Sequence, residues 1–371
     1  MSEFSEKNKN TAFKKNIIEE INFFLTGDAI FSLIDKRMEI YWKEMLNYSK
    51  ITCFIDSDEL KLHGFDLNKK NMKKVSKVNF WEKLITKSNS KNSDNIMGFL
   101  QFEGPYMSRN SVHVLKLLKV ALLNSFNIHL YSYLDGVHLG HKNQKPSEFE
   151  NIAKGLIELK NQASEKNLEF LMLACSRCGT ARGYIKSQDQ NGYYQSDDVL
   201  TSYFFCNLNK IIDKFEQNHN IFSKSSILVQ GDPKENNKII TNQNNFKTSL
   251  LIVISHSPYG SEWTFGGLSF AVACANHGIQ TQVLFIENGI YCLFGTHNVS
   301  SDDKIFNIQE IINATGDMKN LEYFAFFPSI QQRGMIYNKE IEDLKIINGD
   351  NLGNIIFSLQ DNTIQKRIFF F

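Results

Sequence analysis

The sequence predicts an α/β protein of three tandem units, each with a mainly parallel sheet covered by helices. The first observation behind this prediction is a repeated apolar strand that ends in an acid or amide, a small residue and a β-branched residue. The three triplets are Asp28-Ala29-Ile30, Asp135-Gly136-Val137 and Asn288-Gly289-Ile290. The second observation is that each triplet is followed by another strand and a turn. These turns end at Gly64, Gly183 and Gly334. Such self-similarity predicts homologous units.

Two polar segments without periodicity mark the boundaries between the units. They are Thr86–Asn95, TKSNSKNSDN, and Gly231–Lys247, GDPKENNKIITNQNNFK, and both are typical of linkers. The predicted units are therefore residues 1–95, 96–246 and 247–371.

The first unit is shorter than the other two. It has a possible helix at Phe13–Glu20 and a strand at Ile21–Leu25, but no apolar first strand precedes them in the sequence. The polar Met1–Asn10 could not fill a central parallel strand. We therefore expect a truncated sheet in this unit, or a sheet whose missing strand another unit supplies.

The second and third units share one plan of strand, turn and helix. In the second unit the plan is the strand Ile96–Phe102, the turn Glu103–Tyr106 and the helix Ser111–Ser125, with apolar residues at helical spacing. In the third unit it is the strand Leu250–Ser255, the turn Ser257–Ser261 and the helix Gly266–His277. Strands that alternate with helices predict parallel sheets.

Composition excludes several classes of function. The chain has 371 residues and a formal net charge of +1, which argues against a nucleic-acid clamp built on bulk electrostatics and against stable nucleic-acid binding. The polar N-terminal stretch has no signal-peptide core, and the longest clean apolar run, Leu250–Ile254, is too short to cross a bilayer. We expect a cytoplasmic protein that does not associate with membranes.

Cys175 is the candidate reactive residue. The apolar run Leu168–Ala174 predicts a buried strand that stops at Cys175, where a turn-rich Ser-Arg-Cys-Gly begins. Ligands bind at the carboxyl ends of strands in open α/β sheets. Backbone N–H groups at this point, with Arg177 and Arg182 close in sequence, would favour a thiolate. Sulfur transfer needs an exposed thiolate of low pKa, and this site is a credible one.

The sequence predicts different roles for the other cysteines. Cys206, Cys274 and Cys292 lie in apolar patterns, which favours core packing, and six cysteines in a chain of this length without a secretory signal do not indicate a disulfide framework. Cys178 could form a redox pair with Cys175, be half of a metal site, resolve a persulfide or simply pack beside Cys175.

Cofactor sites are not indicated by the sequence. His138 and His141 could join Cys175 and Cys178 in a Cys/Cys/His/His set, but the second Cys-x-x-Cys that a closed zinc site would normally need is absent from the sequence, so we expect no metal. The turns after the first strands match neither a P-loop nor a dinucleotide fingerprint, so we expect no nucleotide.

Several of these motifs resemble the sulfur-relay family of the Dsr and Tus proteins. The second unit is similar to DsrE/TusD through Gly104-Pro105-Tyr106, Asp135-Gly136-Val137 and the six residues that separate Cys175 from Arg182-Gly183. The third resembles DsrF/TusC through Ser257-Pro258-Tyr259-Gly260, Asn288-Gly289-Ile290 and Arg333-Gly334. The first resembles DsrH/TusB through Gly27–Ile30, Asp58-Glu59-Leu60 before His63-Gly64, and Phe80-Trp81. The chain thus resembles a fusion in the order H–E–F.

The resemblance implies a flavodoxin-like fold in each unit and a sulfurtransferase that relays persulfide sulfur. It implies that Cys175 accepts sulfur from an upstream persulfide carrier and passes it to a downstream TusE/DsrC-like carrier, with Cys178, Arg182 and Gly183 as possible auxiliary residues. Sulfur would travel as a cysteine persulfide without another cofactor, and the chain would form a homodimer. The resemblance favours 2-thiolation of the tRNA wobble uridine; sulfur trafficking in dissimilatory sulfur oxidation and a non-catalytic scaffold are the alternatives.

The first and third units depart from this pattern. Counted back from Gly334, the position equivalent to Cys175 is Phe326, and counted back from Gly64 it is Asp56. Cys53 lies within a predicted strand, where it is expected to face the core. One reactive unit with two supporting units is therefore expected.

Overall fold

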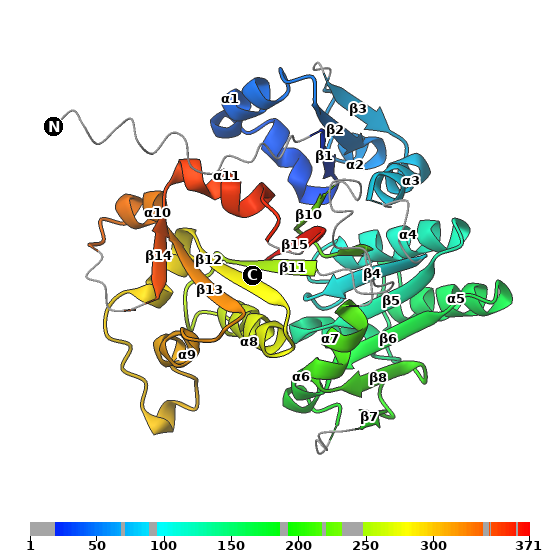
Figure 1. Ribbon diagram of the computed structural model, residues 1–371. Coiled ribbons are helices and arrows are strands. Elements are labelled where there is room, and N and C mark those ends of the chain that lie inside the picture. The colour runs from blue at the N-terminus through cyan, green and yellow to red at the C-terminus, as the bar shows by residue number, and fades with distance from the viewer. Residues whose placement is uncertain are drawn as a thin grey trace, which may run out of the picture. The chain divides into compact units, whose positions relative to one another are not determined.

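The computed structural model describes residues 19–67, 71–88, 95–185, 192–216, 220–231, 248–336, 341, 343–360 and 363–371. The chain divides into two compact units, Met1–Lys87 and Ser88–Phe371. The described strands form three sheets, and most neighbouring strands in them are parallel (Figure 1). The predicted α/β class with mainly parallel, helix-flanked sheets is confirmed. The unit boundaries expected at residues 95/96 and 246/247 stay predictions.

The unit Met1–Lys87 contains a three-stranded parallel sheet of order β1-β2-β3. Its strands are β1 (Ile21–Leu25), β2 (Ile51–Asp56) and β3 (Met72–Val75). Its helices are η1 (Gly27–Leu33), α1 (Lys36–Met45), α2 (Ser57–Leu62) and α3 (Lys77–Ser88). The core is small and includes Trp42 and Cys53. Within the described residues no strand precedes β1, and most of the helix expected at Phe13–Glu20 lies outside them.

The second sheet has six strands in the order β7-β8-β6-β5-β4-β9. Its strands are β4 (Ile96–Gln101), β5 (Asn127–Ser132), β6 (Phe170–Cys175), β7 (Tyr193–Tyr194), β8 (Tyr203–Cys206) and β9 (Asn220–Phe222). Its helices are α4 (Asn110–Leu123), η2 (Leu134–Gly140), α5 (Ile152–Glu165), α6 (Ser176–Ala181) and α7 (Leu208–Glu216). All neighbouring strands are parallel except the short edge strand β7. The carboxyl ends of β4, β5 and β6 therefore meet at one edge.

The third sheet has six strands in the order β10-β15-β11-β12-β13-β14. Its strands are β10 (Ser226–Gln230), β11 (Thr248–Ile254), β12 (Gln280–Phe285), β13 (Leu321–Phe326), β14 (Leu344–Ile347) and β15 (Gln365–Phe370). Its helices are α8 (Glu262–Asn276), η3 (Glu287–Leu293), η4 (Ser301–Asp303), α9 (Ile308–Thr315), α10 (Phe327–Gln332) and α11 (Gly349–Phe357). The antiparallel edge strand β10 comes from the range expected to belong to the second unit.

Helices α7 and α8 pack against each other between the two six-stranded sheets (Figure 1). An aromatic cluster fills this space: Phe215 of α7 contacts Phe270 of α8 and Phe369 of β15, at ring centroid distances of 5.7 and 5.8 Å. Tyr133, before η2, donates a hydrogen bond to the Gly266 carbonyl. Because these contacts are buried, they join both sheets into one core.

The repeated triplets sit in equivalent short 3₁₀ helices, which explains the repeat in physical terms. Each of η1, η2 and η3 begins at a residue with positive φ: Gly27 at 54°, Leu134 at 51° and Glu287 at 47°. A Cβ on Gly136 would lie 2.1 Å from the carbonyl oxygen of Gln101, and one on Gly289 would lie 2.1 Å from that of Ile254. The middle residue is glycine in the second and third triplets because the ends of the neighbouring strands β4 and β11 leave no room for a side chain.

Candidate functional site

Cys175 ends β6 and occupies the N-cap position of α6. A strand that runs directly into a helix places the first helical N–H groups around the side chain of the junction residue. The backbone N–H groups of Arg177 and Cys178 lower the pKa of Cys175, although its side chain makes no capping hydrogen bond to the helix. The helix ends at Arg182, and Gly183 follows with φ of 78°, a left-handed conformation that favours glycine.

Cys178 lies within hydrogen-bond contact of Cys175. The Cys178 thiol donates to the Cys175 sulfur, and this bond, the two backbone N–H donors and the nearby Arg177 charge together lower the pKa of Cys175 despite its burial. The same bond, with burial, raises the pKa of Cys178 well above its usual range. Of the two cysteines, Cys175 is therefore the one that loses its proton first, while Cys178 stays a thiol.

The Cys175 side chain is less accessible than sulfur transfer requires, because only 3% of the residue surface is exposed. Neighbours distant in sequence enclose it: Cys206 is its register partner on β8, and Tyr133 lies close enough to interact electrostatically. A reaction partner would reach this sulfur only after the surrounding segments open locally.

The remaining cysteines are structural in their surroundings. Cys53, Cys206, Cys274 and Cys292 are completely buried, as the apolar patterns predict. Burial raises the pKa of Cys53, Cys206 and Cys292 to about 12. All six cysteines lie in the described part of the chain, and among them Cys175 has the one lowered thiol pKa.

Arg182 connects the cysteine helix to two other elements. Its guanidinium lies 2.7 Å from Asp135 of η2 and 2.6 Å from Glu262 at the start of α8, and it donates to the Cys178 carbonyl at 3.5 Å. The side chain is only 13% exposed. The short helix that carries both cysteines is thus tied to η2 and to the neighbouring sheet's first helix.

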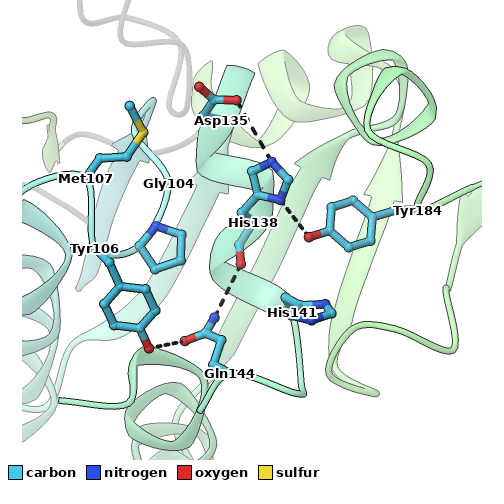
Figure 2. A pocket seen from close by; sticks show the side chains of 9 residues that line it. Gly104, Tyr106, Met107, Asp135, His138, His141, Gln144 and Tyr184 are labelled. Carbon is cyan, nitrogen blue, oxygen red and sulfur yellow. Dashed lines mark hydrogen bonds and ion pairs between the residues drawn. The ribbon is translucent and has the colours of Figure 1, made fainter. Parts of the chain in front are cut away.

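A cavity of about 490 Å³ lies at the same edge of the second sheet, beside this helix (Figure 2). Its lining comes from the turn after β4, from η2 and from the residue after Gly183: Gly104, Pro105, Tyr106, Met107, Asp135, His138, His141, Gln144 and Tyr184. Gln144 connects two sides of the cavity, since its side chain accepts a hydrogen bond from the Tyr106 hydroxyl at 2.8 Å and donates one to the His138 carbonyl at 3.3 Å. Asp135 joins the cavity to Arg182.

His138 carries the polar chemistry of this cavity. Its Nδ1 lies 2.7 Å from the Tyr184 hydroxyl, and its Nε2 lies 4.0 Å from Asp135 (Figure 2). Burial and the nearby Arg182 charge lower the pKa of His138, so the ring is neutral near pH 7. His141 also lines the cavity, but within the described residues no group of three or more His, Cys, Asp or Glu side chains is arranged to hold a metal ion.

Equivalent positions in the other two sheets lack the thiol. Asp56 ends β2 as the N-cap of α2, and Phe326 ends β13 as the N-cap of α10, so the positions found by counting back from the glycines do coincide in structure. Arg333 bonds to Asn288 in the third sheet as Arg182 bonds to Asp135 in the second. Aligning the repeats could have revealed the latter pair; Glu262 and Tyr184 left no comparable signal in the sequence.

Comparison with known proteins places part of the chain near one family. Residues 95–222 match the DsrE/DsrF-like family. An uncharacterized protein of Methanopyrus kandleri is 33% identical over 81 residues, which are 22% of this chain and 62% of the relative. The ychN protein of E. coli, a solved structure, aligns with a TM-score of 0.29 and 18% identity, covering 33% of this chain and 99% of that one.

None of the helices that the structure describes is long and apolar enough to span a bilayer.

Proposed function

We propose that this chain is a sulfur-relay protein in which Cys175 carries sulfur as a persulfide. The observation that carries the proposal is the Cys175–Cys178 pair, in which a thiol and two backbone N–H groups stabilise one thiolate at a strand end. The DsrE/DsrF-like match over residues 95–222 includes this pair and suggests sulfur relay in general. A lowered thiol pKa is what a nucleophilic sulfur acceptor requires near neutral pH.

The transfer consists of two displacements at sulfur. In the first, the Cys175 thiolate attacks the outer sulfur of a donor persulfide R–S–SH, so that a new S–S bond forms on Cys175 and the thiolate R–S⁻ leaves. In the second, an acceptor thiolate R′–S⁻ attacks the outer sulfur of the Cys175 persulfide, which yields R′–S–SH and restores the Cys175 thiolate. No electrons are gained or lost, and no cofactor is consumed.

We further propose the biological setting that the family resemblance implies. The donor is an upstream persulfide carrier, the acceptor is a TusE/DsrC-like carrier, and the pathway is 2-thiolation of the tRNA wobble uridine in the cytoplasm. The chain acts as a homodimer in this proposal, with Arg182 and Gly183 shaping the cysteine helix. Sulfur trafficking in dissimilatory sulfur oxidation is the alternative pathway for the same chemistry.

A dithiol function is the second candidate, and the hydrogen bond between the two thiols favours it. If Cys178 loses its proton, it can attack the inner sulfur of a Cys175 persulfide, which forms a Cys175–Cys178 disulfide and releases HS⁻. This reaction would release one sulfide and leave a disulfide, which an external dithiol reductant would have to reduce before the protein could act again as a sulfide-releasing enzyme. A Cys178→Ser variant separates the two, because a carrier keeps most of its transfer without Cys178.

The test of the main proposal is intact mass after incubation with a persulfidated cysteine desulfurase. Wild type should gain about 32 Da, one sulfur atom, and Cys175→Ser should gain none. Absence of added sulfur on both proteins would refute the relay and favour a non-catalytic scaffold. Equal gains on both would place the acceptor at another cysteine.

A further inference from the structure

Arg177, between the two cysteines, and Arg182, after them, both contact residues from the part of the chain that forms the third sheet. Arg182 pairs with Glu262, and the Arg177 guanidinium carbon lies 5.6 Å from the ring centroid of Phe265, one turn further along α8. Phe306, in the segment before α9, lies 5.3 Å from the same guanidinium. Residues of α8 and of the segment before α9, which belong to the part of the chain without a reactive thiol, thus contact both arginines near Cys175.

The two phenylalanines form one surface for Arg177. Their rings stack with centroids 4.9 Å apart and an interplanar angle of 5°, so the guanidinium meets both ring faces at once. Arg177 itself is solvent-exposed, and an exposed arginine without such contacts would sample many rotamers. Cation–π contact of this kind is worth about 0.5–1 kcal/mol at an exposed site, enough to bias the rotamer toward one position.

Arg177 supplies the positive charge that acts on the Cys175 sulfur. The titratable groups facing Cys175 are Cys178 and Arg177 on α6, Tyr133 before η2, and Cys206 on β8. The thiol of Cys178 is neutral, and burial keeps Tyr133 and Cys206 neutral as well. Arg177 is therefore the positively charged group among these neighbours, and its effect adds to the larger ones of Cys178 and the backbone N–H groups.

We propose that Phe265 and Phe306 are positioning residues, which hold Arg177 beside Cys175 and thereby stabilise its thiolate. This inference rests on the proposed role of Cys175 as a sulfur acceptor, and it gives the thiol-free third sheet a part in that role. The equivalent positions of Arg177 fit the same reasoning: Asp58 in the first unit and Pro328 after β13 carry no positive charge, and neither follows a cysteine.

The test is the pH dependence of Cys175 alkylation by iodoacetamide in the full-length chain, with the modified residue identified by peptide mass. The midpoint of the rate profile reports the thiolate pKa, whereas the plateau reports access, so the two effects separate. Leucine substitutions at Phe265 and Phe306 keep the apolar contact but remove the aromatic face. Ile305→Ala is the matched control, because Ile305 is exposed beside Phe306 and is not in the aromatic pair.

The Phe265→Leu/Phe306→Leu double variant should shift the midpoint upward by up to about half a pH unit, at most a threefold loss of thiolate below the midpoint, because the cation–π energy is the most that the rings can contribute. Arg177→Met should shift it by at least as much, and Ile305→Ala should leave it unchanged. A double variant with the wild-type midpoint would overturn the positioning role if Arg177→Met still shifts. If the midpoint of Arg177→Met equals that of wild type, the Arg177 charge does not stabilise the Cys175 thiolate, and the proposal is overturned.

Alkylation needs no persulfide, so this result is independent of the sulfur-transfer assay. If Cys175 never accepts sulfur but its midpoint depends on Phe265 and Phe306, the proposed function fails while the positioning holds. If Cys175 accepts sulfur and the midpoint is insensitive to the rings, the positioning fails alone. Circular dichroism and thermal unfolding of each variant check that the fold is kept.

Discussion

Replacing Cys178 with alanine should raise the pKa of Cys175, because it removes the largest contribution that stabilises the thiolate. A hydrogen bond to a charged group is worth about 1.5–3 kcal/mol, and one pKa unit corresponds to about 1.4 kcal/mol. The expected rise is therefore about one to two units. Cys178→Ser retains a hydroxyl donor at the same position, so the pKa of Cys175 in this variant should lie between its values in wild type and in Cys178→Ala.

The thiolate absorbance in the ultraviolet, followed against pH, measures this shift. Cys206→Ala is the matched control: Cys206 is equally buried and is the register partner of Cys175 on β8, but its thiol is not the one that stabilises the Cys175 thiolate. Its removal should leave the titration near that of wild type. If Cys178→Ala titrates at the wild-type pH, the reasoning from the thiol–thiol hydrogen bond is wrong.

Three further predictions test the surroundings of the site. Gly136→Ala and Gly289→Ala should each lower the free energy of unfolding in urea by about 1–3 kcal/mol or more, since the added Cβ meets a backbone carbonyl; unchanged midpoints would contradict the close approach. Arg182→Met should lower the free energy of unfolding by about 1 kcal/mol at low salt and by less at high salt, because Asp135 and Glu262 are half-exposed. A loss of stability that does not depend on salt would count against the ion pairs. Burial lowers the pKa of Lys366 from 10.5 to about 8, so between these values the unfolded chain binds more protons and stability rises with pH. Between pH 7 and 10 the free energy of unfolding of wild type should therefore rise by roughly 2 kcal/mol relative to that of Lys366→Met. If the unfolding free energies of the two proteins change in parallel with pH, the lowered pKa of Lys366 is refuted.

The fold class followed from the sequence because its signals are local. Alternation of apolar strands and amphipathic helices, and the triplets that follow β1, β5 and β12, can be recognised without knowledge of distant contacts. The start of α8 was missed by four residues, because Ser261 caps a first turn, beginning at Glu262, that precedes the apolar stripe. The placement of β10 beside β15 could not be predicted, since its partner lies at the other end of the third sheet's sequence.

The candidate site was predictable to a similar degree. The position of Cys175 at the junction of strand and helix came from an apolar run that stops at a turn, and Cys178 lies one helical turn further on. The burial of Cys175 was not foreseen, because it depends on Tyr133, Cys206 and other residues that only the fold brings together. The contacts of Glu262, Phe265 and Phe306 with this site could not be predicted for the same reason, since these residues lie in α8 and before α9, far along the chain.

The three equivalent N-cap positions give an internal argument for an anionic Cys175. Asp56 at this position accepts hydrogen bonds from the N–H groups of Asp58 and Glu59, at 3.1 and 3.4 Å, and from the Thr26 hydroxyl at 3.1 Å. The same backbone geometry thus accommodates a carboxylate in the first unit. In the second sheet the N–H groups of Arg177 and Cys178 lower the pKa of a thiol at the same position.

Phe326, the third member of this set, shows what the position becomes without an anion. Its side chain makes no capping hydrogen bond, and Pro328 follows within the first turn of α10, where its missing N–H removes one donor. Ser329, at the position of Cys178, instead accepts from the N–H of Glu287 at 2.9 Å. The repeats therefore share an N-cap position between a strand and a short helix, whereas a thiol, a thiol donor and a held arginine occur together at Cys175. This combination, and not the repeat itself, makes the second sheet the reactive one in our proposal.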